Sequence, residues 1–248
     1  MFRHCAALRM ETSPHVGFPE THWSLVLGAR GNSVRGHAAL EELCAIYWPP
    51  LYSYARRAGN SPESAADAVQ GYLARLLVRG DLEKIDPDRG RFRSYLLAGI
   101  RHYLVSEARK EQAAKRGGEG YSFSLDAEDV ERSVALELTE QVTPEIAFDR
   151  RWAQTVIDRA IGRLATEHTT RGRGDHFEAL KPTLAGDDPM GYAELGRRLG
   201  LSEGAVGVAI HRLRARLREL VRSEVAHTVG TESDLEDELR HLLGVWSG

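Results

Sequence analysis

Apolar residues recur along most of this 248-residue chain at intervals of three and four positions, the period of one face of an α-helix. Strict alternation of apolar and polar residues, the pattern of half-buried strands, is nearly absent. The apolar stripes predict helices that bury, in turn, Leu40, Leu43, Cys44 and Tyr47; Val69, Tyr72, Leu73 and Leu76; Phe92, Tyr95, Leu96, Ile100, Tyr103 and Leu104; Trp152, Val156, Ile157, Ala160, Ile161 and Leu164. The pattern therefore predicts an all-α protein.

Capping signals indicate where several of these helices begin and end. Ser61-Pro62 and Thr143-Pro144 each place a capping hydroxyl before a proline at the first helical position. Pro49-Pro50 is expected to end a helix, because proline lacks an amide hydrogen and its ring clashes with the preceding turn. Ser233 with Glu236 forms a capping box, which predicts a short amphipathic helix near the end of the chain.

Residues 192–218, YAELGRRLGLSEGAVGVAIHRLRARLR, predict a helix-turn-helix. Gly200 suits the turn because glycine adopts positive φ without steric cost, and Gly196 lies where the two helices must touch. Ser202 is the expected N-cap of the second helix, which such a unit places in the major groove of DNA. The inward positions are Leu195, Leu199, Leu201, Val206 and Ala209. An ordinary helical hairpin is the alternative, but it does not explain the arginines that follow, at positions 212, 214, 216 and 218.

Composition adds a segregation of charge that the net value hides. Hydrophobic residues make up 42% and charged residues 28% of the chain, so a packed core is expected. The net charge is only −3, yet residues 91–116 are strongly basic and residues 119–149 strongly acidic. Such a layout predicts a partner with more than one electrostatic face.

Cysteine and histidine give no sign of a metal, a cofactor or a disulfide framework. The two cysteines, Cys5 and Cys44, and the ten histidines show no metal-ligand spacing. No apolar run is long enough to span a membrane, and no signal-peptide pattern opens the chain. We therefore expect a cytoplasmic protein with no membrane contact, no metal and no cofactor. Met10 is an alternative start.

Three segments resemble bacterial sigma-70 family transcription initiation factors of the extracytoplasmic-function (ECF) type. Residues 51–77, LYSYARRAGNSPESAADAVQGYLARLL, are similar to the family's LYRYA…DAEDLVQEVFLRL. Residues 90–110, GRFRSYLLAGIRHYLVSEARK, are similar to its FRAWL…ARN…LRR pattern. In the helix-turn-helix, LGLSEGAV…HRLRARLREL is similar to LGISEGTV…HRARKRLREL. The three segments follow the family's order.

The resemblance implies a factor that is not an enzyme, binds core RNA polymerase and promoter DNA, and directs promoter recognition, DNA melting and initiation. It implies no small-molecule substrate, and an anti-sigma or other regulatory protein is a further candidate partner. The expected layout is two helical domains joined by a linker: a disordered 1–18, a region 2-like domain 19–117, an acidic linker 118–142, a region 4-like helix-turn-helix domain 143–230, and an amphipathic extension 231–248.

One helix offers a face of small side chains, which suits docking against another helix. The expected polymerase-binding residues are Asp67, Gln70, Gly71 and Ala74. In the family this face contacts the clamp helices of the largest polymerase subunits, and Gly71 stands where the family usually has Glu. A solvated helix face is the alternative interpretation.

The next helix combines cations, which neutralise phosphates, with aromatic rings, which stack on unpaired bases. The expected minus-10 DNA-binding residues are Arg93, Tyr95, Arg101, His102, Arg109, Lys110, Lys115 and Arg116. Tyr95 replaces the family's usual Trp, and His102 replaces its Asn. For Tyr95 and Tyr103 a place in the core is an equally weighted alternative.

The recognition helix presents short side chains on its outward side, among them Val208. The expected minus-35 DNA-binding residues are Ser202, Glu203, Gly204, Gly207, His211, Arg212, Arg214 and Arg216. Several are too short to reach a base edge, so we expect modest direct readout and a contribution from groove shape.

Two other functions are alternatives for this chain. An autonomous, dimeric helix-turn-helix repressor or activator would bind DNA tightly without polymerase, but needs neither the docking face nor the aromatic-basic helix. An enzyme with a DNA-binding appendage lacks support, because the chain shows no nucleophile–base pair, phosphate loop or metal spacing. For residues 233–243, a packing helix is favoured over a regulatory tail.

Overall fold

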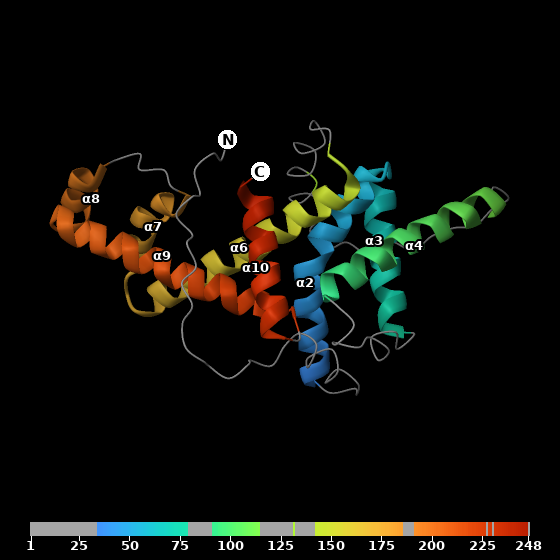
Figure 1. The fold of residues 1–248 in the computed structure, drawn as a ribbon, viewed down its shortest axis with the longest axis horizontal. Helices are drawn as coiled ribbons and strands as arrows, with labels where there is room; N and C mark the ends of the chain where they lie inside the picture. Colours follow the sequence, from blue (N-terminus) through green and yellow to red (C-terminus); the bar gives the residue numbers. More distant parts are fainter. Residues whose placement is uncertain are drawn as a thin grey trace. The chain divides into compact units, whose positions relative to one another are not determined.

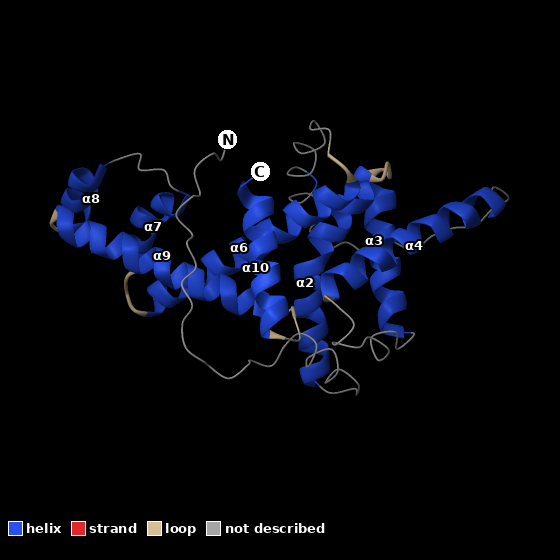
Figure 2. Ribbon diagram, in the orientation of Figure 1, coloured by secondary structure: helices blue, strands red, loops and turns tan. Residues whose placement is uncertain are grey.

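The computed structural model describes residues 34–78, 91–114, 131, 142–185, 191–226, 228–229 and 231–247. Every regular element in these ranges is helical, as Figures 1 and 2 show, which confirms the predicted all-α class. The α-helices are α2 (Val34–Arg57), α3 (Pro62–Val78), α4 (Phe92–Ala114), α6 (Pro144–Thr170), α7 (Gly174–Leu180), α8 (Gly191–Leu199), α9 (Glu203–Ala226) and α10 (Glu232–Ser247). A 3-10 helix, η3 (Lys181–Ala185), follows α7.

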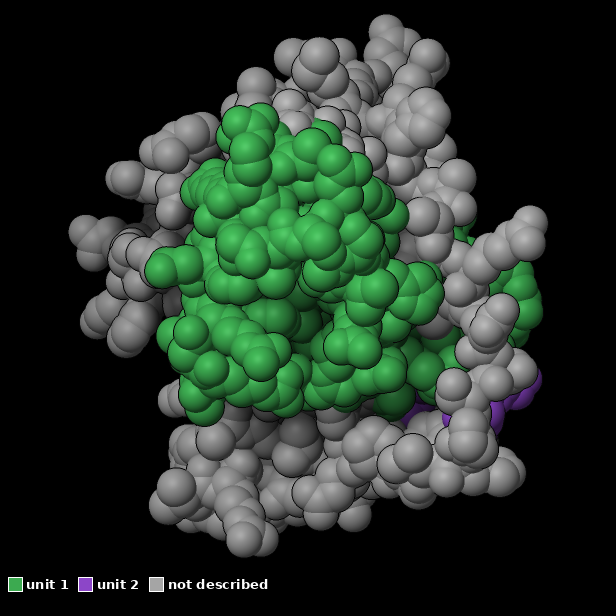
Figure 3. All heavy atoms as spheres, turned by 90° about the vertical axis from the view of Figure 1, so that its left-hand side faces the viewer, with its two compact units in different colours: residues 1–19, 156–226, 235–248 green, residues 20–155, 227–234 purple. Residues whose placement is uncertain are grey.

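The chain divides into two compact units, coloured in Figure 3. Unit 2 contains α2, α3, α4 and the first part of α6, up to Thr155. Unit 1 contains the rest of α6, then α7 to α9, and α10 from Leu235. Residues 143–155, which the sequence assigned to the second domain, thus group with the helices of the first.

The core of unit 2 forms where α2, α3 and α4 pack against one another. The rings of Tyr47 and Phe92 meet edge to face with centroids 5.2 Å apart, and both are fully buried. Leu51, Val69 and Leu96 are likewise excluded from solvent. This three-helix core holds α4 with one side inward and the other exposed.

The expected end of a helix at Pro49-Pro50 is wrong, because α2 continues through both prolines to Arg57. Proline inside a helix costs about 3 kcal/mol. On either side of the prolines, however, α2 buries the large rings of Trp48 and Tyr52, which stack with centroids 4.8 Å apart. Burying each large side chain contributes about 1.5–3 kcal/mol, so the two rings offset much of the roughly 6 kcal/mol that two prolines cost.

In unit 1, α8 and α9 pack as a pair, with α7 against α8 and η3 against α9. Glu224 on α9 is 4% exposed and accepts hydrogen bonds from Arg159 (3.0 Å) and Arg163 (2.7 Å) on α6. Burial alone raises the pKa of Glu224, but these two bonds outweigh it and hold the pKa below its ordinary value. The ion cluster therefore ties α6 to α9.

Most capping predictions are confirmed, and one is corrected. The hydroxyls of Ser61 and Thr143 accept hydrogen bonds from the amides three residues on, at 3.2 and 3.3 Å. At α10 the cap is Thr231, whose hydroxyl accepts from the Asp234 amide at 3.1 Å, and not Ser233. The capping threonine lies two residues earlier than expected, and its hydroxyl also donates to the Asp234 carboxylate at 2.7 Å.

No helix in the described part of the chain is long and apolar enough to cross a membrane.

Candidate nucleic-acid interface

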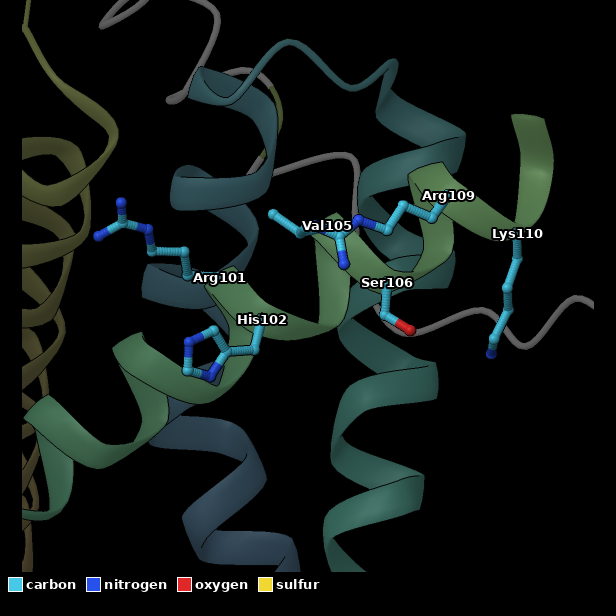
Figure 4. A pocket seen from close by; sticks show the side chains of 6 residues that line it. All are labelled: Arg101, His102, Val105, Ser106, Arg109 and Lys110. Atoms are coloured by element: carbon cyan, nitrogen blue, oxygen red, sulfur yellow. The ribbon is translucent and has the colours of Figure 1, made fainter. Parts of the chain in front are cut away.

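The exposed side of α4 carries a strip of basic side chains. Positions 101, 105 and 109 and positions 102, 106 and 110 each advance by four, so they share one face of the helix. They line an open depression of about 570 Å³, shown in Figure 4: Arg101, His102, Val105, Ser106, Arg109 and Lys110. We call these six residues the α4 basic face. The cations are exposed to solvent, which leaves them accessible to phosphates.

Beside this face, the groove between α3 and α4 forms a second cavity of about 410 Å³. Its aromatic lining comes from Tyr72 on α3 and from Tyr95 and Tyr103 on α4, and His102 belongs to both cavities. Tyr95 is 36% exposed, so the structure favours an accessible ring over a core position. Tyr103 is half-buried, and burial raises the pKa of its hydroxyl. Cations and an aromatic ring therefore lie within one region of α4.

The place of Arg93 differs from the one expected of a DNA contact. Arg93 is 6% exposed and forms an ion pair with Asp149 of α6. Its guanidinium also lies 5.1 Å from the ring centroid of Trp152. Both partners follow more than fifty residues later in the sequence, so no local pattern reveals them. Arg93 joins α4 to α6 within unit 2, while Lys115 and Arg116 lie outside the described residues.

The expected docking face of α3 is only partly open. Asp67 and Ala74 are exposed and Gln70 is half-buried. Gly71, however, faces α4, because a Cβ added there would overlap the hydroxyl of Tyr103. A reciprocal pair exists at Gly99 of α4, where an added Cβ would overlap the hydroxyl of Tyr72. The two glycine–tyrosine pairs let α3 and α4 approach closely, which explains why a long side chain is missing at position 71.

The helix-turn-helix forms as the sequence predicts. Gly200 adopts φ +66° between α8 and α9. A Cβ on Gly196 would lie 2.6 Å from the Leu201 carbonyl oxygen, so the helices pass too closely there for any side chain. The Ser202 hydroxyl accepts from the Ala205 amide at 3.2 Å, as an N-cap does. Leu195 and Val206 are buried, and Leu199, Leu201 and Ala209 are half-buried.

The expected minus-35 residues fall into two groups. Those at the start of the recognition helix, the N-cap Ser202 and then Glu203, Gly204, Gly207, His211 and Arg212 of α9, are exposed or half-exposed. Arg214 and Arg216 instead bind other parts of unit 1. Arg214 donates to the Thr183 carbonyl of η3 (Nη2, 2.6 Å), and Arg216 bridges Glu167 on α6 and Glu219 (both 2.6 Å).

Residue 131, inside the segment predicted as a linker, forms hydrogen bonds with α2 that the sequence did not predict. Glu131 accepts two hydrogen bonds from Arg56 of α2, from Nε at 2.9 Å and Nη2 at 2.7 Å, and one from the Tyr52 hydroxyl. The bond from Arg56 is the main reason that the pKa of Glu131 lies below its ordinary value. The signal in the sequence is weak, since one glutamate among many acidic residues carries no distinguishing pattern.

In the described residues, a formed helix-turn-helix and an exposed basic-aromatic helix are features typical of DNA-binding proteins. Residues 43–114, which contain most of α2 and all of α3 and α4, match the family model described as Sigma-70 region 2. This part of the chain is similar to a sigma-70 region 2 domain, and the match supports a role in RNA polymerase binding and promoter recognition. Searches of curated proteins and of solved structures found no match.

Proposed function

We propose that this protein is a sigma factor of the ECF type, which binds core RNA polymerase and directs it to a two-part promoter. The observation that carries the proposal is the α4 basic face, because it lies inside the segment that matches sigma-70 region 2. Cations hold the phosphates there, and the exposed ring of Tyr95 is available to stack on an unpaired base. The protein thus acts by binding and not as an enzyme.

The helix-turn-helix supports the second half of the proposal. It lies in unit 1, outside the segment that matches region 2. The first turns of its recognition helix, α9, carry exposed residues. We assign this unit to the minus-35 element and the α4 basic face to the minus-10 element. Core polymerase docks on α3 through Asp67 and Ala74, and the site of action is the cytoplasm, where polymerase and promoter meet.

The test measures binding of purified core RNA polymerase and run-off transcription from a genomic promoter library. Wild type is expected to bind the polymerase and to programme defined transcripts. Asp67→Arg reverses an exposed charge on the docking face and is expected to reduce polymerase binding at least tenfold. Glu178→Arg makes the same change at an exposed site of α7, outside region 2, and is expected to leave polymerase binding intact.

The alternative function is an autonomous helix-turn-helix repressor or activator, which the formed helix-turn-helix in unit 1 would equally suit. It predicts tight binding of duplex DNA by the protein alone and no affinity for core polymerase. That pair of results would replace the sigma-factor proposal.

A further inference from the structure

The outward side of the first turns of α9 carries small and apolar residues between the exposed polar side chains of Glu203, His211 and Arg212. Val206, Ile210 and Leu213 face the core of unit 1 and are buried. On the other side Val208 is 51% exposed, the highest value for any large hydrophobic side chain that the structure describes. The recognition helix therefore presents an aliphatic side chain to solvent in its second turn.

A second apolar group continues this surface. Tyr192, at the start of α8, is 41% exposed. Its ring lies against Gly207, since a Cβ added to that glycine would be 3.6 Å from Tyr192 Cε2. Gly204, one turn before Val208, is exposed and has open space around it. We call Tyr192, Gly204, Gly207 and Val208 the apolar strip.

Neither helix propensity nor packing accounts for the strip. Each glycine in a helix interior costs about 1 kcal/mol relative to alanine, and β-branched valine is also a weaker helix former. Gly204 has room for a side chain, so packing within unit 1 does not demand glycine there. The two glycines and the valine make the start of α9 less stable and keep its outer surface low. This arrangement indicates that a binding partner approaches the helix backbone closely.

The surroundings of the strip indicate what approaches. Arg198 at the end of α8 and Arg212 on the next turn of α9 are exposed and cationic, while Arg197 beside them forms an ion pair with Glu194. This arrangement of an apolar centre with flanking cations complements the major groove, where phosphates border the base edges. On those edges the 5-methyl group of thymine is the apolar feature.

We propose that Val208 contacts a thymine methyl group and makes the protein select thymine within its minus-35 element. The inference rests on the proposed function, in that the helix-turn-helix must bind promoter DNA. Gly204 and Gly207 contribute by letting the helix backbone come close to the groove floor. A short side chain thus selects a base by its methyl group and not by hydrogen bonding.

The test removes single methyl groups from the DNA. A duplex is selected from a random 30-bp library with the protein bound to core polymerase, and each thymine facing the helix-turn-helix is then replaced by deoxyuridine. At one or two of these positions we expect the affinity of wild type for the duplex to fall about fourfold. This factor corresponds to the free energy of burying one methylene-sized group. Val208→Ala is expected to bind the thymine duplex more weakly and to show no further loss with deoxyuridine.

Ile146→Ala is the matched control, because it truncates another exposed aliphatic residue, 44% exposed on α6, and should keep the full deoxyuridine effect. Circular dichroism checks that each variant is folded. A deoxyuridine loss that persists in Val208→Ala, or none at any thymine, overturns the inference alone, as does a selected site without thymine. Failure to select any duplex overturns both the proposed function and the inference.

Discussion

At the scale of single residues, Gly196 is a position where an added side chain would meet the backbone of the neighbouring helix-turn-helix residue Leu201. The obstacle is the Leu201 carbonyl oxygen, a backbone atom that cannot rotate away. Gly196→Ala is expected to lower the free energy of unfolding by about 2 kcal/mol, the usual cost of overpacking. Urea unfolding followed by circular dichroism measures the change.

Gly204→Ala is the matched control, because it makes the same substitution in the same helix-turn-helix at a site with open space. Because Gly204 is the second residue of α9, where helix propensity has less effect than in the interior, the substitution is expected to raise stability by less than about 1 kcal/mol. Equal effects of the two substitutions would contradict the steric explanation.

Glu224 gives the protein a stability that depends on pH. Because its pKa in the folded state lies below the ordinary value of 4.5, its contribution is complete above that value and is lost as the pH falls through the folded pKa. Glu224→Gln is expected to destabilise by about 2 kcal/mol at pH 7, the scale of a hydrogen bond to a charged group. The difference from wild type should shrink as the pH falls below 4.5 and through the lowered pKa of the folded state.

Urea unfolding at several pH values between 7 and 3 tests this expectation. Glu178→Gln, at an exposed site of α7, should follow the wild-type curve throughout. A Glu224→Gln deficit that stays constant down to pH 3 would show that the loss comes from packing and not from the charge.

At the scale of elements, the crossing of α3 and α4 depends on the two glycine–tyrosine pairs. Gly71→Ala is expected to destabilise unit 2 by about 1–2 kcal/mol, because the new methyl group overlaps the Tyr103 hydroxyl. Tyr103→Phe removes that oxygen and leaves the ring carbon Cζ at 3.2 Å, so the double variant should recover part of the loss.

A double-mutant cycle measured by thermal unfolding gives the coupling between positions 71 and 103. Additive losses in the cycle would mean that the two side chains do not share this space.

Sequence periodicity predicted the elements well where local chemistry decides the outcome. Ser202, Gly200 and Gly196 set the ends and the turn of the helix-turn-helix, and each acts on neighbours within a few residues. The roles that sequence could not give depend on distant partners. Arg93 and Arg216 look like other exposed cations in the sequence, and only the fold brings Asp149 and Glu167 to them.

At the scale of the whole molecule, a net charge of −3 does not favour DNA binding, so affinity must come from local cationic faces. The logarithm of the DNA-binding constant falls linearly with the logarithm of the salt concentration, and each phosphate contact steepens this slope by about 0.9. Arg109→Ala in the α4 basic face is expected to reduce that slope by about 1 when polymerase-bound protein is titrated with promoter duplex.

Arg216→Ala provides the contrast, because its charge is already neutralised by Glu167 and Glu219. The slope should stay unchanged, although the sequence predicted a DNA contact for both residues. A reduction of about 1 in Arg216→Ala would restore the original assignment, and no change in Arg109→Ala would remove the α4 basic face from the interface.

The glycine at position 71 also limits how this protein can change over generations. An acidic side chain there would overlap the Tyr103 hydroxyl, so it requires the Tyr103 side chain to move or to become smaller. A smaller residue at 103 by itself would loosen the packing of α3 against α4. Substitutions at positions 71 and 103 are therefore expected to arise as a pair and not singly.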